Sequence, residues 1–127
     1  MKHTMTTSRL LKHLLCWFDD FPYVRLDRKC RVAELDHAQD GRVFAHVFHH
    51  AGLIICLCRA FDKLPLGHRI GILLHEIGHL MSDGGEAEAD LWVQDNLDID
   101  IDFKPLRGKI ERSVQWVDPK KVGLSSR

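Results

Sequence analysis

The sequence predicts an α+β fold, in which a small β-sheet is followed along the chain by a pair of helices. Two short segments with strand-like patterns lie on either side of one glycine, and a long apolar segment with helical spacing comes after them. The chain has 127 residues, about the size of one typical domain. We therefore expect a single domain over residues 1–127, with frayed ends at 1–7 and 119–127.

The first expected element is a helix over residues 10–18. Leucines and a phenylalanine recur there at helical spacing, and the polar residues between them fall on the opposite face. Ser8, or one of the threonines before it, can cap the start of this helix. Pro22 ends the helical segment because a proline disfavours helical backbone angles in the residue before it.

Strands are expected in the middle of the chain. Residues 23–35 have a mixed pattern with room for one or two strands. Residues 42–49 alternate loosely, residues 53–58 are apolar on both faces, and Gly52 separates the two segments. This pair predicts a β-hairpin.

The second half of the chain begins with two predicted helices, over residues 68–81 and 86–96. The sequence Asp-Gly-Gly at 83–85 breaks the helical pattern between them. The residues of the second helix that we expect to face inward are Ala87, Leu91 and Val93. Alternation of Asp with Ile and Phe predicts a strand over 98–103, and 110–117 is expected to hold a last short element.

Composition excludes several classes of protein. Lys plus Arg and Asp plus Glu both number 18, so the formal net charge is zero, which argues against direct binding to nucleic acid through a broad basic surface. The longest apolar run, residues 51–58, is far shorter than the ~20 residues that span a bilayer. The four cysteines form neither a disulfide framework nor paired zinc knuckles, and the N-terminus lacks a secretory signal pattern. We therefore expect a cytoplasmic protein that does not bind membranes.

One motif carries chemistry: the sequence His75-Glu76-Ile77-Gly78-His79. Residues four apart lie on the same face of a helix, so His75 and His79 can bind one metal ion. Glu76, one step around the helix, can act as general base on a metal-bound water. Roughly 0.02 matches are expected by chance in a chain of this composition. The pattern therefore predicts a catalytic metal site rather than a core helix with incidental histidines.

A third metal ligand should follow the motif, because catalytic zinc has three protein ligands and a water. No histidine or cysteine occurs after His79, so a downstream ligand must be a carboxylate. A helical hairpin would bring Glu86 opposite His79 and would let Asp90 accept the outer N–H of a ligand histidine. The pattern favours Glu86 as ligand and Glu88 as a solvated residue. The candidates that remain open are Asp83, Glu86, Glu88 and Asp90.

These residues resemble the gluzincin metallopeptidases, in which HExxH precedes a helix that bears ExxxD or ExxAD. The chain is most similar to the small ImmA/IrrE-like branch over residues 53–96, although its gap between the second histidine and the glutamate is shorter than usual. The residues that match the pattern are His75, Glu76, His79, Glu86, Ala89 and Asp90. The resemblance implies a minimal zincin-like domain that binds Zn²⁺ and cleaves a peptide bond. Several members of that branch are linked to the cleavage of repressors.

The resemblance also implies where the substrate binds. In zincins the strand before the active-site helix lines the cleft, so we expect a protein or peptide substrate to pair with residues 53–59. A central core strand would explain the apolar pattern of these residues equally well, and both interpretations stay open. The side chains of a type suited to stabilising the oxyanion are Tyr23, His49, His50 and His68. The alternative prediction is a non-catalytic metal-binding protein of zincin fold that recognises a protein partner.

Overall fold

The computed structural model describes residues 5–18, 25–27, 45–48, 54–57, 59–82, 84–106 and 112–124. Its elements, in chain order, are α1 (Thr7–Trp17), β1 (Arg25–Asp27), β2 (Ala45–Phe48), β3 (Ile54–Leu57), η1 (Arg59–Lys63), α3 (Leu66–Ser82), α4 (Glu86–Leu97), β4 (Asp102–Leu106), β5 (Arg112–Trp116) and η2 (Pro119–Val122). This is the α+β fold that the sequence predicts. Among the described residues, no helix is both long and apolar enough to cross a membrane.

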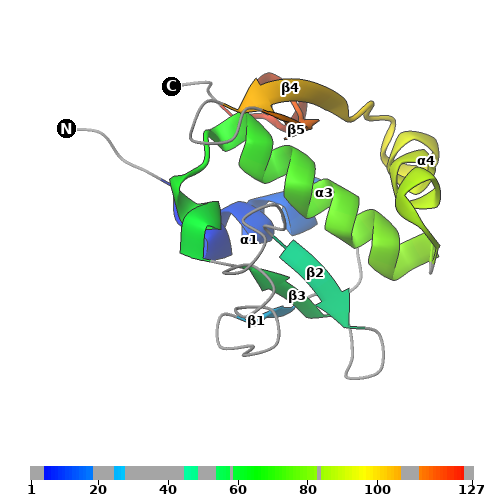
Figure 1. The fold of residues 1–127 in the computed structure, drawn as a ribbon, viewed down its shortest axis with the longest axis horizontal. Helices are drawn as coiled ribbons and strands as arrows, with labels where there is room; N and C mark the ends of the chain where they lie inside the picture. The colour runs from blue at the N-terminus through cyan, green and yellow to red at the C-terminus, as the bar shows by residue number, and fades with distance from the viewer. Residues whose placement is uncertain are drawn as a thin grey trace.

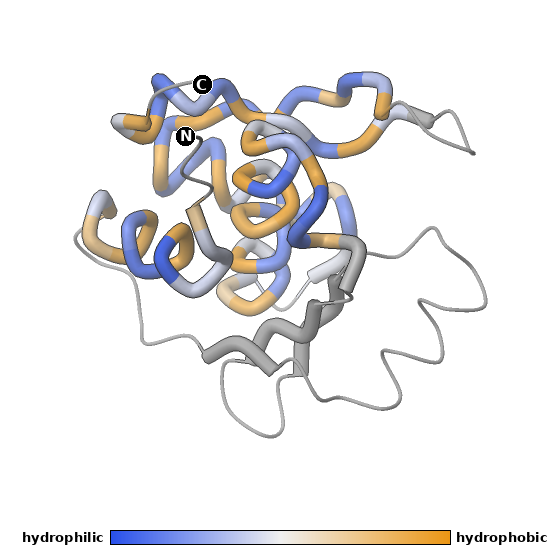
Figure 2. The backbone as a smooth tube through the Cα atoms, turned by 90° about the vertical axis from the view of Figure 1, so that its left-hand side faces the viewer, coloured by the Kyte–Doolittle hydropathy of each residue, from blue (hydrophilic) through white to orange (hydrophobic). Residues whose placement is uncertain are grey.

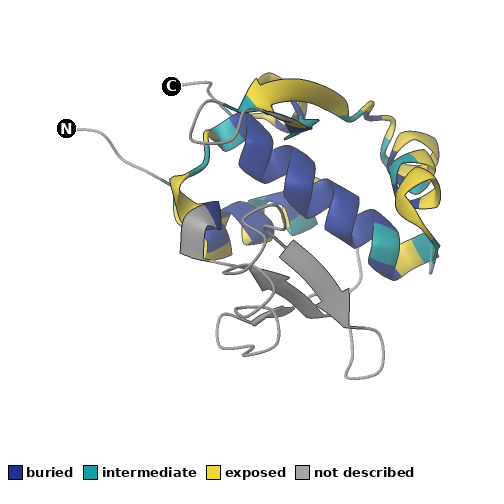
Figure 3. Ribbon diagram, viewed as in Figure 1, coloured by how far each residue is buried: buried dark blue, intermediate teal, exposed yellow. Residues whose placement is uncertain are grey.

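Helix α3, which carries the HExxH motif, is the central element of the fold. It runs through the middle of the molecule, with β2, β5 and α4 packed against it (Figure 1). Most of its residues are buried, from Gly67 to Leu80 (Figure 3). An apolar sequence on nearly every face is typical of a helix enclosed by other elements. The expected start and end of this helix agree with the structure to within two residues.

The first sheet has three strands in the order β1-β3-β2. β2 and β3 form the expected antiparallel pair, with Val47 opposite Ile55, and β1 runs parallel to β3 on its other side. β3 is therefore the central strand, and both of its backbone edges are hydrogen-bonded. The expectation that a peptide pairs with this strand is wrong, because a central strand has no free edge.

Strands β4 and β5 form a separate antiparallel pair in which Lys104 lies opposite Val114, and β5 packs against α3. The strand predicted over 98–103 begins only at Asp102. Asp98 instead ends α4 in the left-handed conformation, at a φ of 55°. The buried side chain of Ile99 explains the alternating pattern there, since one inward residue in a connecting segment resembles the start of a strand.

Helix α1 packs its leucines into the core, and the side chain of Thr6 caps it by accepting the N–H of Arg9. Hydrophobic and hydrophilic residues alternate in short stretches along the helices (Figure 2). In α1 this pattern is typical of a helix that places one face on the core.

Described residues near both ends of the chain contact the rest of the fold. Thr7 is buried and its hydroxyl donates a hydrogen bond to the Asp62 carboxylate, so this residue is held by the fold. At the other end, residues 119–122 form η2, in which Pro119 and Val122 are buried. Lys120 and Lys121 lie between these two apolar residues, so the segment looks polar in the sequence and its burial is not predicted. Residues 1–4 and 125–127 lie outside the described residues.

Helix α4 has almost the expected bounds but a different inward face. Ala89 and Val93 are fully buried, whereas Ala87 and Leu91 are exposed. The prediction that these side chains face inward is confirmed for Val93 and is wrong for Ala87 and Leu91. Ala89 packs against the backbone of α3, and this contact sets the rotation of the helix.

Candidate metal centre

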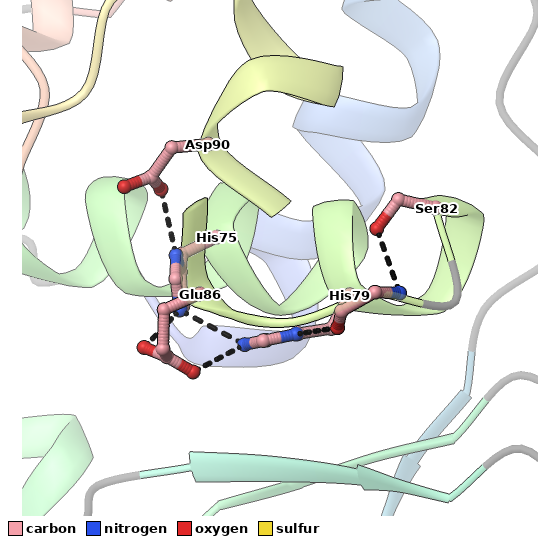
Figure 4. Close-up of polar contacts among 6 residues, drawn as sticks. His75, His79, Ser82, Glu86 and Asp90 are labelled. Atoms are coloured by element: carbon pink, nitrogen blue, oxygen red, sulfur yellow. Dashed lines mark hydrogen bonds and ion pairs between the residues drawn. The ribbon is translucent and has the colours of Figure 1, made fainter. Parts of the chain in front are cut away.

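Three side chains from two helices converge at the end of α3 (Figure 4). His75 and His79 lie one turn apart on α3, and Glu86 is the first residue of α4. The His75 Nε2 and Glu86 Oε2 atoms are 3.0 Å apart, and the His79 Nε2 and Glu86 Oε1 atoms are 2.7 Å apart. The two Nε2 atoms are 3.0 Å from each other. Each residue thus offers one ligand atom, all within 4.8 Å of one another, in a group that can hold a metal ion.

The other nitrogen of each ring is held by an acceptor. His75 Nδ1 lies 2.7 Å from Asp90 Oδ1, and His79 Nδ1 lies 3.0 Å from the main-chain oxygen of Gly84. A carboxylate and a carbonyl oxygen only accept hydrogen bonds, so both Nδ1 atoms carry the proton. The contact between Asp90 and His75 is the one that the spacing of the residues predicts.

The hydrogen bonds at Nδ1 determine that the free lone pair of each ring is at Nε2. A neutral imidazole protonated at Nδ1 has a lone pair at Nε2. Two such lone pairs and the oxygens of Glu86 therefore point into the same small volume, where they repel one another unless a metal ion or a proton lies between them. Atoms bound to a tetrahedral zinc ion lie roughly 3.3 Å apart, since each bond is about 2.0–2.1 Å long. The distances of 2.7–3.0 Å fit that arrangement after a shift of a few tenths of an ångström.

A short turn brings Glu86 to the histidines. Gly85 precedes α4 as its N-cap residue, and the helix begins at Glu86. A carboxylate in the first turn also interacts favourably with the positive end of the helix dipole. The gap between His79 and Glu86, although short for the gluzincin pattern, is long enough for Glu86 to contact both rings.

Glu76 lies next to this group and is enclosed by protein. Its side chain is 8% exposed, and no hydrogen bond joins its carboxyl group to another described residue. Burial, and secondarily the negative charge of Glu86, raise the pKa of Glu76 to about 8. A carboxyl group with a raised pKa can both take up and release a proton near neutral pH.

The structure shows which of the other site residues predicted from the sequence contact the His75, His79 and Glu86 group. Asp90 contacts the outer nitrogen of His75, and Glu88 is exposed and outside the ligand group. His68 is buried at the other end of α3, where its Nδ1 lies 3.0 Å from the main-chain oxygen of Gln115. It therefore binds β5 and is not available to an oxyanion. The candidates that lie outside the described residues are Tyr23, His49, His50 and Asp83.

Sequence reasoning missed Gly84 as part of the site. Its contribution is a main-chain carbonyl oxygen, and any residue type carries one, so residue identity alone cannot reveal it. The only sequence signal is the break at Gly84-Gly85, which predicts a turn but not the atom that the turn presents.

Comparisons with known proteins do not assign a family. No protein-family model matches the chain, and neither the curated proteins nor the solved structures that were searched contain a match. The function is therefore inferred from the geometry of the site.

Proposed function

We propose that this protein is a zinc-dependent metallopeptidase that hydrolyses a peptide bond in a protein or peptide substrate. One observation carries the proposal: three lone-pair donors converge beside a buried carboxyl group that has no hydrogen-bond partner among the described residues. Structural zinc sites have four protein ligands, whereas catalytic sites have three and keep one position open. Two imidazoles and a carboxylate suit zinc well.

Each residue has a distinct role in the proposed reaction. His75, His79 and Glu86 hold the metal, and Asp90 fixes the ring of His75 through its Nδ1–H. When bound, the ion supplies Lewis acidity, which polarises a carbonyl group and makes a water molecule more acidic. Glu76 takes the proton of the attacking water and later gives it to the leaving amine.

The substrate is proposed to bind along β2. This strand packs against α3 and is hydrogen-bonded on one side only, to β3, within the described sheet. Its outer edge can pair with an extended peptide backbone, as in other proteins that bind peptides by strand addition. Such pairing would bring a peptide carbonyl alongside the helix that carries the metal ligands.

The proposal is tested by metal content and by cleavage. Purified protein is expected to contain about one zinc per chain, which His75→Ala removes. Glu76→Gln keeps the metal but abolishes cleavage of a peptide library, and Glu88→Gln serves as the matched control because Glu88 is exposed and outside the ligand group. Folded protein that takes up no zinc would contradict the proposal. Zinc binding without any cleavage would favour the non-catalytic metal-binding alternative.

A further inference from the structure

We propose that Gly84 is a positioning residue for the metal site, through a main-chain carbonyl that orients His79. The inference rests on the proposed metal binding but not on peptidase activity. It concerns how the second histidine is held, since His75 has a carboxylate on its outer nitrogen and His79 does not.

The hydrogen bond from His79 to Gly84 decides two properties of the ring. His79 Nδ1 donates to the Gly84 oxygen over 3.0 Å, so the lone pair is at Nε2. The same bond fixes the rotation of the ring, which places Nε2 at 2.7 Å from Glu86 and 3.0 Å from His75. A carbonyl that moved away would leave the tautomer and the rotation of His79 unspecified.

Gly84 is itself held from two sides. Its N–H donates to the Ser82 hydroxyl over 3.2 Å (Figure 4). Its Cα faces the first turn of α4, where a Cβ on residue 84 would lie 2.5 Å from Glu88 Cβ. A side chain at residue 84 would therefore collide with Glu88 unless residue 84 or the first turn of α4 moved.

This contact allows a test by loss and rescue. Gly84→Ala forces residue 84 away from Glu88 and displaces its carbonyl, and we expect zinc affinity to fall about 10- to 100-fold, the range for losing an outer partner of a ligand histidine. Adding Glu88→Gly removes the colliding Cβ, after which the nearest side-chain atom to the alanine methyl group is Ser82 Oγ at 3.4 Å. The double variant should regain most of the affinity. Glu88→Gly and Glu88→Gln alone, which control for the loss of the side chain and its charge, should bind zinc like the parent protein.

Zinc affinity is measured on the full chain by competition with a chromophoric chelator, so no substrate is needed. Unchanged affinity in Gly84→Ala would overturn the inference while leaving the proposed function intact. A loss that the double variant shares in full would overturn it too, because the contact with Glu88 would then not be the cause. Parent protein that binds no zinc would overturn both proposals.

A second measurement does not depend on whether the variants fold. Nitrogen-15 NMR of the zinc-loaded parent protein should show the proton of His79 on Nδ1, with slow exchange and a hydrogen-bonded shift. A proton on Nε2 of His79, or an Nδ1 proton that exchanges as fast as that of an exposed histidine, would overturn the role of the Gly84 carbonyl.

Discussion

Gly78 and Ala89 hold the two site helices in contact, backbone to backbone. A Cβ on Gly78 would lie 2.2 Å from the carbonyl oxygen of Ala89, far inside van der Waals contact. The approach is close because Gly78 has no side chain and Ala89 has only a methyl group. Gly78 lies one residue before His79, and Ala89 lies three residues after Glu86. The distance between the helices at this contact therefore governs whether Glu86 reaches the histidines.

Gly78→Ala should consequently damage both stability and metal binding. The added methyl group must push α4 away from α3, and overpacking of this kind costs about 1–3 kcal/mol. Urea unfolding in the presence of a chelator measures that cost, and zinc competition measures the loss of affinity. Gly85→Ala is the control, since its Cβ would meet only the end of the Glu88 side chain, at 3.1 Å. Equal effects of the two substitutions would contradict the role given to the contact.

Asp90→Asn should weaken metal binding without removing it. The asparagine oxygen can still accept the Nδ1–H of His75, but the negative charge that makes the ring a better ligand is lost. We expect zinc affinity to fall about tenfold, toward the lower end of the range for such partners. Asp95→Asn tests the same change of charge on an exposed residue of the same helix. If both variants lost affinity equally, a general effect of charge would explain the result.

Glu76 should make the metal-free protein less stable as the pH rises. Its pKa is about 8 in the folded state and 4.5 in the reference state, so between these values the folded chain holds a proton that the unfolded chain has released. The favourable contribution of neutral Glu76 is complete below pH 4.5 and is lost as the pH rises through 8.

Glu76→Gln removes this titration and cannot ionise. The free energy of unfolding of the variant, relative to the parent protein, should therefore increase between pH 5 and pH 8. Urea unfolding in chelator at both pH values measures the difference, and Glu88→Gln controls for an exposed carboxylate. A constant difference between the parent protein and Glu76→Gln at the two pH values would show that the folded-state pKa of Glu76 is not raised.

The sequence predicts most of what depends on local patterns. The bounds of α3 and α4, the pairing of β2 with β3 and the approach of Glu86 to the two histidines follow from periodicity, turn residues and the four-residue repeat of a helix. Each of these features needs only residues that are near one another in the chain, which is why they can be deduced without a structure.

Features set by distant contacts could not be deduced in this way. The inward face of α4 depends on the fit of Ala89 to Gly78, and the periodicity of α4 alone allowed Leu91 instead. The central place of β3 depends on its parallel pairing with β1, which is about 30 residues earlier in the chain. The Gly84 carbonyl is a main-chain group that residue identity does not mark.

The C-terminal segment also depends on contacts between residues that are distant in the chain, and these contacts yield a further prediction. Val122 is fully buried in the core cluster that includes Leu10 and Leu14 of α1, and its main-chain oxygen accepts a hydrogen bond from His13 Nε2 over 2.6 Å. The neighbouring Gly123 has a φ of 75° and lies against the ring of Trp17. These contacts hold η2 against α1, so residues 119–122 are part of the core and do not form a solvated tail.

Val122→Ala should therefore cost about 1.5–3 kcal/mol, because it removes two buried methyl groups and leaves a cavity beside α1. Lys121→Ala, the exposed neighbour, should change stability by less than about 0.5 kcal/mol. Urea unfolding of both variants in chelator separates the two expectations without any contribution from the metal. If Val122→Ala changed stability as little as Lys121→Ala, η2 would contribute nothing to the core. Truncation after Asp118 would then be tolerated as well.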